Sequence, residues 1–345
     1  MRAIICAGPG EAKLVSDRPI PTLRDDYVLV KTHSVAINPT DWKHVDFIST
    51  TGALVGCDYA GFVEEEGKAV TKDFKKGDRI AGFVHGMNAV QIEDGAFAEF
   101  IVAKGDLQFQ IPNSMSFDEA ATLPLGVITV GQNMYQAMGL PWPNNPSSSG
   151  EKVLIYGASS ATGTLAVQFA KLSGLSPIAV CSSKHFDLVK SLGATAVYDY
   201  KTDLPSKIRV ETNNSLKYAF DCISSQSTAE YCAAALTSGS DAKFSNLLGE
   251  VSPRKDVASS SGIAYTAMGE DIVYIGTPIA ASAEDFEFAR RWFEMTESFL
   301  AEGKLKTHPL KIGPNGLAGV LEGMDLSRKG LVSGQKLVYH VSETP

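Results

Sequence analysis

The sequence has few cysteines, no long apolar run and no block of one charge. Its five cysteines (Cys6, Cys57, Cys181, Cys222 and Cys232) form no C-x-x-C pair, which argues against disulfides and for a reducing compartment. No apolar run approaches the roughly 20 residues of a membrane span. Lys and Arg number 31 against 39 Asp and Glu, without a basic block for nucleic acid. We expect a cytoplasmic protein that acts on small molecules, with no membrane or nucleic-acid partner.

A chain of 345 residues is too long for one ordinary core and predicts two domains. The first 115 or so residues hold short β-type runs between Gly, Pro and Asp, such as "YVLVKTHSVAI" and "AFAEFIVA", which predict an antiparallel, barrel-like domain. The start "MRAIICAGPGEAKLV" is typical of a strand and turn rather than a signal peptide.

From about Leu123 the pattern changes to apolar runs such as "EKVLIYG" and "SPIAVCSS" that alternate with helical segments. Such alternation predicts βαβ units and a parallel sheet, so the fold class is α/β. Residues 241–282 read as weakly patterned, with an irregular insertion in "NLLGEVSPRKDVASSSG". An amphipathic helix, "EDFEFARRWFEMTESFLAEGK", and a helix with a closing strand follow. We expect one domain from residues 1–122 and 300–345 and a second from residues 123–299.

The segment "YGASSATGTLAVQFAKLSG", residues 156–174, lies where a predicted strand turns into a helix. Such a junction can bind a pyrophosphate through backbone N–H groups and the helix dipole. The usual G-x-G-x-x-G pattern is replaced by Gly157, Ser160 and Gly163. The glycines suit a tight turn and close helix packing, and the Ser160 hydroxyl can donate to a phosphate. A helix merely packed by small residues is the alternative.

The next predicted strand indicates which dinucleotide this loop binds. An NAD site places a carboxylate at the end of that strand to bind the ribose 2′-hydroxyl. Here the strand ends in Ser182, Ser183, Lys184 and His185. Hydroxyl, ammonium and imidazole groups favour a 2′-phosphate, so we expect NADPH, unless Lys184 is only a surface lysine.

Together, "SVAINPTDWK", "GCDYAGFV", "KKGDRI", "DGAFAEF" and the glycine segment resemble the medium-chain dehydrogenase/reductase superfamily over essentially the whole chain. The match is to its zinc-free quinone-oxidoreductase and enoyl-reductase branch. Within it, "VCSSKHFDLVKSLGA", "LKYAFDCI" and "GKLKTHPLKI" are most similar to fungal enoyl reductases that act in trans with polyketide or polyketide–peptide hybrid synthases. The resemblance implies a GroES-like domain joined to a Rossmann domain.

The resemblance also implies the site residues. Lys43 is the candidate catalytic residue, to stabilise charge or relay a proton, with a surface lysine as the alternative. The implied cofactor-binding residues are Thr40, Asp41, Trp42, Lys43, Gly157, Ser159, Ser160, Ala161, Thr162, Ser182, Ser183, Lys184, His185, Tyr200, Leu247, Leu248, Val332 and Ser333. The implied substrate-binding residues are Gly126, Val127, Ile128, Thr129, Val130, Gly131, Gln132, Asn133, Thr266, Ala267, Met268, Gly269 and Glu270. For the run 126–133, packing between domains is the alternative.

No metal is expected. The positions that match the catalytic zinc ligands of alcohol dehydrogenases hold Asn38, Cys57 and Asp58. One thiol and one carboxylate do not make the three-ligand site that catalytic zinc needs. Residues 80–110 contain no cysteine, so the structural zinc lobe is missing, and the lone His85 is expected to be structural or exposed.

These features predict a zinc-independent, NADPH-dependent oxidoreductase that reduces the α,β-double bond of carrier-bound polyketide thioesters. Its expected partners are a polyketide or hybrid synthase with its acyl carrier protein, and the expected state is a monomer. One alternative is a general NADPH:quinone oxidoreductase or enone reductase, against which the irregular insertion argues. The other is a catalytically silent NADPH-binding protein, against which the retained Lys43 argues.

Overall fold

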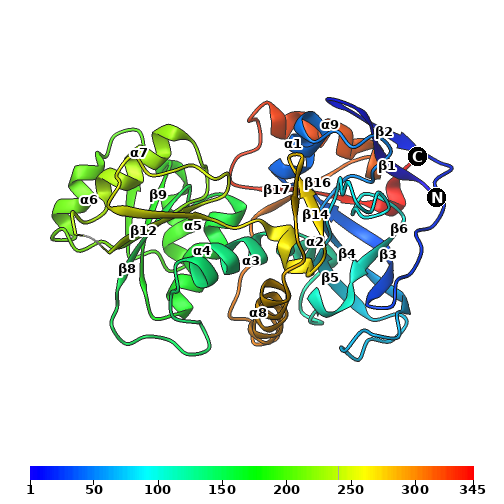
Figure 1. Cartoon of the computed structure of the whole chain (residues 1–345), viewed down its shortest axis with the longest axis horizontal. Helices are drawn as coiled ribbons and strands as arrows, with labels where there is room; N and C mark the ends of the chain where they lie inside the picture. The colour runs from blue at the N-terminus through cyan, green and yellow to red at the C-terminus, as the bar shows by residue number, and fades with distance from the viewer. Residues whose placement is uncertain (240) are drawn as a thin grey trace. The chain divides into compact units, whose positions relative to one another are not determined.

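The computed structural model describes residues 1–239 and 241–345, and it divides into two compact units (Figure 1). Unit 1 comprises Met1–Leu125 and Tyr265–Pro345, and unit 2 comprises Gly126–Ala264. Each unit is described by itself below.

Unit 1 is built on a mostly antiparallel sheet with strand order β16-β17-β3-β4-β5-β7, and β6 also pairs with β3. Only the β16–β17 pair is parallel. Two small two-stranded sheets, β1–β2 and β14–β15, accompany it. The strands are β1 (Ala3–Gly8), β2 (Glu11–Val15), β3 (Tyr27–Ala36), β4 (Asp58–Glu66), β5 (Arg79–Phe83), β6 (Phe100–Lys104), β7 (Gln108–Gln110), β14 (Ile272–Tyr274), β15 (Thr277–Ile279), β16 (Leu310–Gly313) and β17 (Lys336–His340).

Helices cover this sheet and close its core. They are α1 (Pro39–Phe47), α2 (Phe117–Ala121), α8 (Ala283–Ala301) and α9 (Gly316–Arg328), with 3₁₀ turns η1 (Gly105–Leu107), η4 (Ala264–Met268) and η5 (Val341–Glu343). Helix α1 begins where a capping box and a proline direct it: Asn38 is the N-cap, Pro39 follows, and Asp41 accepts from the Asn38 N–H. This start fixes the direction in which the later residues of α1 project.

Unit 2 is a six-stranded parallel sheet with strand order β10-β9-β8-β11-β12-β13. This 3-2-1-4-5-6 order is that of a doubly wound nucleotide-binding fold. Its strands are β8 (Lys152–Tyr156), β9 (Ser176–Cys181), β10 (Ala196–Asp199), β11 (Tyr218–Asp221), β12 (Ala242–Asn246) and β13 (Val257–Ser261). Its helices are α4 (Ala161–Leu172), α5 (Phe186–Ser191), α6 (Pro205–Glu211) and α7 (Gln226–Ala235), with the turn η3 (Ser183–His185). Helix α3 (Pro124–Val130) and the π-helical η2 (Gly131–Ala137) lead into it.

The return to unit 1 comes earlier than the expected residue 300, because the structure groups the chain from Tyr265 onward with unit 1. Aromatic packing explains this boundary: Phe293 of α8 stacks with Phe83 and Phe109, at ring-centroid distances of 5.8 and 6.1 Å. An ion pair between Lys72 and Glu297, 2.6 Å apart, ties the same helix to unit 1. Helix α8 therefore belongs to the core of unit 1.

The weakly patterned stretch of residues 241–282, which includes the expected insertion, contains two strands of the parallel sheet, β12 and β13. Strands β12 and β13 pair in register, and the irregular part is confined to the residues between them. Strand β13 escaped prediction because "VASSS" has no apolar face: Val257 is buried, but its other residues are mostly exposed. An edge strand can keep such a pattern because it pairs on one side only. This segment therefore no longer argues against a quinone reductase.

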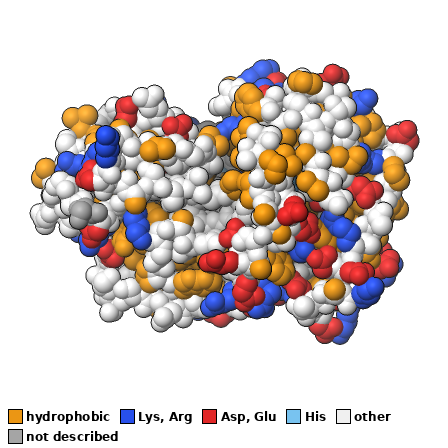
Figure 2. Space-filling view, in the orientation of Figure 1, with side chains coloured by type: hydrophobic (Ala, Val, Ile, Leu, Met, Phe, Trp, Pro, Cys, Tyr) orange, Lys and Arg blue, Asp and Glu red, His pale blue; other side chains and the backbone are white. Residues whose placement is uncertain are grey.

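None of the helices among the described residues could cross a membrane. On the face shown in Figure 2, acidic and basic side chains lie interspersed over both units. All five cysteines are buried and unbonded to one another.

Candidate active site

The glycine loop of unit 2 has the geometry that a phosphate site requires. Gly157 has φ of 72°, a conformation that favours glycine, and a Cβ there would lie 2.7 Å from Cγ1 of Ile223. A Cβ at Gly163 would lie 2.3 Å from the Gly157 carbonyl oxygen, so helix α4 packs directly on the turn. Ser160 caps α4 by accepting from the Gly163 N–H at 3.0 Å. Ser159, Ala161 and Thr162, which surround this start, are half-buried.

The loop after β9 presents the polar groups expected to bind a 2′-phosphate. Ser183 and Lys184 are exposed, whereas Ser182 and His185 are half-buried. A carboxylate does lie nearby, contributed by the next strand: Asp199 accepts from the Ser183 N–H at 3.1 Å and from the Lys201 N–H at 2.9 Å. These backbone donors lower the pKa of Asp199. The Asp199 carboxylate is thus engaged by backbone N–H groups of the turns that follow β9 and β10.

Apolar side chains line the carboxyl edge of the parallel sheet. Tyr200, Ile223 and Leu248 follow β10, β11 and β12, and they are 45%, 49% and 51% exposed. Ligands of doubly wound sheets bind at this edge, where such side chains can pack against the flat faces of a nucleotide. Tyr200, Leu247 and Leu248 were expected here; Ile223 was missed. Its signal in the sequence is that it follows the strand "YAFD" by two residues.

Helix α1 of unit 1 carries Thr40 and Lys43, both half-buried. Partial burial lowers the pKa of Lys43, because desolvation disfavours the ammonium. Asp41 and Trp42, also expected to bind cofactor, have structural positions instead. Asp41 is 1% exposed and accepts from the Asn38 N–H at 2.6 Å, and Trp42 packs against the core of unit 1.

A hydrogen-bonded aromatic cluster lies behind Thr40. His44 is buried; its Nδ1 lies 3.3 Å from the Gly86 carbonyl oxygen, so Nδ1 carries the proton and Nε2 accepts from the Thr40 hydroxyl at 2.9 Å. Burial lowers the pKa of His44 to about 4. The Tyr265 hydroxyl lies 3.3 Å from Sγ of Cys57 and 3.5 Å from the Thr40 hydroxyl. Sequence reasoning missed His44, whereas Tyr265 begins the segment "YTAMGED", residues 265–271, that the resemblance indicated as a pocket candidate.

His85 belongs to the same cluster. Its ring stacks on that of Tyr265 with centroids 3.9 Å apart, and burial lowers its pKa to about 3. Of the two expectations for this lone histidine, the structural one is confirmed.

The positions that match zinc ligands in alcohol dehydrogenases are occupied by a buried ion-pair network. Asp58 Oδ2 accepts from Lys336 Nζ at 2.5 Å and from Asn38 Nδ2 at 2.8 Å, and Oδ1 accepts from the Leu125 N–H at 2.7 Å. Burial raises the pKa of the Cys57 thiol well above its usual value. Within residues 1–239 and 241–345, no three His, Cys, Asp or Glu side chains converge to hold a metal ion. Asp58 is thus already paired with a cation.

The first expected substrate segment, Gly126 to Asn133, is almost entirely buried, and only Thr129 is half-buried. Gly126 serves close packing, since a Cβ there would lie 2.7 Å from Cδ1 of Leu165 on α4. Asn133 Oδ1 accepts from the Ser245 hydroxyl at 2.8 Å and from the Gly262 N–H at 3.0 Å. Packing thus accounts for most of this run.

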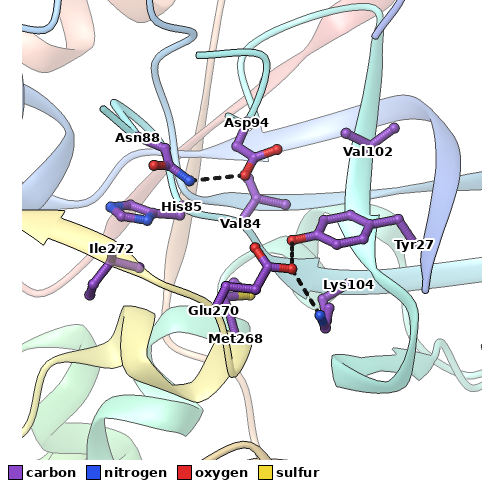
Figure 3. A pocket seen from close by; sticks show the side chains of 10 residues that line it. All are labelled: Tyr27, Val84, His85, Asn88, Asp94, Val102, Lys104, Met268, Glu270 and Ile272. Atoms are coloured by element: carbon purple, nitrogen blue, oxygen red, sulfur yellow. Dashed lines mark hydrogen bonds and ion pairs between the residues drawn. The ribbon is translucent and has the colours of Figure 1, made fainter. Parts of the chain in front are cut away.

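The second expected segment, Thr266 to Glu270, lies in unit 1. Met268 and Glu270 line a small pocket together with His85, Tyr27 and Lys104 (Figure 3). The Glu270 carboxylate accepts from the Tyr27 hydroxyl at 2.7 Å and from Lys104 Nζ at 2.8 Å. The Glu270 carboxylate is therefore held in place by two residues of unit 1, Tyr27 and Lys104.

Other expected residues have varied positions. Ala267 is buried, whereas Thr266 and Gly269 are half-buried. Val332 and Ser333 lie between α9 and β17; Val332 packs against the core and Ser333 is exposed.

Comparison with known proteins gives consistent matches. Residues 24–113 match the alcohol dehydrogenase GroES-like domain, and residues 161–244 match the family described as zinc-binding dehydrogenase. The trans-enoyl reductase resD of Aspergillus sclerotiorum is 48% identical over 359 residues, covering 99% of this chain and 100% of that protein. The chain belongs to the trans-enoyl reductases of the medium-chain dehydrogenase/reductase superfamily.

A second trans-enoyl reductase, TOXD of Cochliobolus carbonum, is 53% identical over 270 residues, which cover 78% of this chain and 91% of that one. Among solved structures, the quinone oxidoreductase of Escherichia coli complexed with NADPH has a TM-score of 0.75 at 17% identity, covering 99% of this chain and 100% of that chain. The predicted fold, a GroES-like domain with a Rossmann domain, is confirmed, and so is the predicted enzyme class, a trans-acting enoyl reductase.

Proposed function

We propose that this trans-enoyl reductase uses NADPH to reduce the α,β-double bond of a polyketide thioester held on the acyl carrier protein of a polyketide or hybrid synthase. We further propose that it acts as a cytoplasmic monomer without zinc. The observation that carries the proposal is the 48% identity to a trans-enoyl reductase over the full length of both chains.

The residues of unit 2 fit NADPH. Gly157 and Gly163 leave room at the start of α4, where the first N–H groups of a helix have no acceptor within it and attract a phosphate. Exposed Ser183 and Lys184 offer a hydroxyl and an ammonium for the 2′-phosphate. Ile223 and Leu248 offer apolar surface at the carboxyl edge of the sheet.

When bound, NADPH would supply the hydride that adds to the β-carbon of the unsaturated thioester. Negative charge then develops on the substrate carbonyl oxygen, and a donor aimed at that oxygen lowers the barrier. We assign this role to Lys43. Its partial desolvation strengthens its interaction with the developing charge and eases release of a proton toward the α-carbon.

Thr40 and His44 would hold this part of α1 in place. Because neutral His44 accepts the Thr40 proton, the Thr40 hydroxyl can only accept further hydrogen bonds, one from the Tyr265 hydroxyl 3.5 Å away and another from a donor on a bound ligand. The buried ring of Tyr265 packs beside His44, and that of His85 stacks on Tyr265.

The role of Lys43 can be tested with two substitutions. Lys43→Ala should lower kcat by about 100-fold or more, because the contact strengthens only as charge develops. The Kd for NADPH should change far less, and Lys43→Met, which keeps the aliphatic stem, should behave alike. Steady-state kinetics with an enoyl thioester and a fluorescence titration of NADPH measure the two effects. Equal loss in binding and turnover would contradict the assignment.

A further inference from the structure

The tip of the β14–β15 hairpin combines a strained backbone with an exposed apolar side chain. Tyr274 pairs with Thr277, so Ile275 and Gly276 form the two-residue turn, with φ of 49° and 74°. Turns with positive φ at both positions favour Asn or Gly at the first one. A β-branched residue there is a conformational outlier. Ile275 is 65% exposed, so burial within the chain does not offset this strain.

The hairpin lies against the helix that carries Lys43. The ring centroids of Tyr274 and His44 are 6.2 Å apart, and Figure 1 shows the hairpin tip beside α1. On α1, Lys43 and Phe47 are four residues apart and therefore share a side of the helix. Phe47 is 72% exposed. In Figure 2, hydrophobic side chains gather over this part of unit 1.

We propose that Phe47 and Ile275 form an apolar shelf that binds the distal hydrocarbon of the acyl substrate and so sets a preference for long chains. This inference rests on the proposed function. The reacting double bond of an enoyl thioester lies next to its carbonyl, and that end belongs at Lys43. The remainder of a long chain extends away from Lys43, and the large apolar side chain that α1 exposes is Phe47. A short chain ends before the shelf.

An acyl chain is a better occupant than a second copy of the protein. A stable protein interface buries about 800 Å² on each partner, far more than two side chains supply. A hydrocarbon chain needs only a narrow apolar path. The strain at Ile275 is then retained for substrate binding, as strained residues at functional sites commonly are.

The test compares Ile275→Asn and Phe47→Gln with Leu331→Asn, a control that removes an equally exposed apolar side chain (67%) elsewhere in unit 1. Substrates are pantetheine thioesters of four-carbon and ten-carbon 2-enoic acids. We expect kcat/KM for the ten-carbon substrate to fall about 5- to 20-fold in the two shelf variants. The four-carbon substrate and the control variant should change less than about 2-fold. Because Asn suits the turn, Ile275→Asn should also unfold at a slightly higher temperature, on the order of 1 °C.

Three results would overturn the shelf. The ratio of kcat/KM for the ten-carbon substrate to that for the four-carbon substrate could stay unchanged in both shelf variants. Both substrates could lose activity equally, which would indicate a structural role. Sedimentation could reveal a wild-type dimer that the variants dissociate, which would make a second copy the occupant. If the wild type reduced neither thioester and bound no saturated ten-carbon product, the proposed function itself would fail, a result distinct from these three.

Discussion

Asp58 illustrates how one side chain can decide what a site does. Its position matches a zinc ligand in alcohol dehydrogenases, but both of its oxygens already accept hydrogen bonds from Lys336, Asn38 and the Leu125 N–H. A buried carboxylate is stable only when paired and hydrogen-bonded, and these donors meet that need. A metal would have to displace the Lys336 ammonium. The zinc-free mechanism remains a prediction with this physical basis.

The preference for NADPH should depend on Lys184. Lys184→Ala removes one charge-assisted contact, worth about 1.5–3 kcal/mol, and should weaken NADPH about 10- to 150-fold. NADH, which lacks the 2′-phosphate, should bind nearly as before. Lys190→Ala is the matched control, because Lys190 is an exposed lysine on the same stretch of chain. Titrations of both cofactors check this, and equal effects on NADPH and NADH would refute the assignment.

His44 should make the fold sensitive to acid. Its pKa is about 4 in the folded protein, against an ordinary value of 6.5, because burial disfavours the imidazolium. Between those values the unfolded chain binds more protons, so the stability that neutral His44 permits is complete above pH 6.5 and is lost as the pH falls toward 4.

His44→Gln keeps one donor and one acceptor but cannot titrate. Between pH 6.5 and 4 its unfolding free energy should fall less steeply than that of the wild type, by on the order of 2–3 kcal/mol over the range. Burial raises the pKa of Asp41 to about 7 and that of Asp94 to about 6, which acts in the opposite direction, so the difference between variant and wild type is the informative quantity. Parallel curves from denaturant unfolding would contradict the account.

How far the sequence predicts the site depends on what each residue does. The places of Gly157 and Lys184 at the ends of β8 and β9 could be predicted from the apolar runs before them, whereas their roles in binding stay predictions. Glu270 was not predictable, because its hydrogen bond to Lys104 joins residues far apart in sequence; the capping role of Asp41 is local and could have been read from its spacing to Asn38. His44 was missed because its contacts with the Gly86 carbonyl oxygen and the Tyr265 ring join residues that lie far apart in sequence.

At the scale of elements, we expect the junction between β8 and α4 to matter most to cofactor binding. Gly157→Ala adds a side chain at φ of 72°, at a cost of about 1–2 kcal/mol, and places it 2.7 Å from Ile223. The loop must shift to relieve that contact, so we expect the Kd for NADPH to rise about 10-fold or more.

Gly150→Ala is the matched control for this change. Gly150 also has positive φ, 62°, but a Cβ there would meet nothing closer than 3.9 Å. It should lower the unfolding temperature comparably and leave NADPH binding unchanged. Thermal unfolding and cofactor titration of both variants separate the backbone cost from the effect on the site. A Gly157→Ala protein that binds NADPH normally would contradict the role of this turn.

Periodicity located most elements, and its failures have a physical cause. The helix of residues 283–301 was predictable because its apolar residues recur on one face. Strand β13 was not, since an edge strand with small polar residues has no apolar pattern to detect. The return to unit 1 was expected at residue 300 but lies at Tyr265. The sequence pattern does not show this, because α8 is held to unit 1 by tertiary contacts of Phe293 and Glu297.

At the scale of the whole molecule, the two units carry different parts of the candidate site. Unit 2 supplies the parallel sheet whose carboxyl edge suits a dinucleotide, and unit 1 supplies α1 with Thr40 and Lys43. The matches to the GroES-like domain and to the dehydrogenase family fall in the corresponding units. The monomeric state remains a prediction.

The central claim is that this enzyme transfers hydride to the double bond of a carrier-bound enoyl thioester. The most direct measurement follows NADPH oxidation with a 2-enoyl chain on an acyl carrier protein, and with a quinone at matched concentration, using mass spectrometry to identify the product. The account predicts reduction of the thioester at its C=C alone, without reduction of the carbonyl, and much slower turnover of the quinone. Quinone turnover orders of magnitude faster than that of any enoyl thioester, carrier-bound ones included, would contradict it.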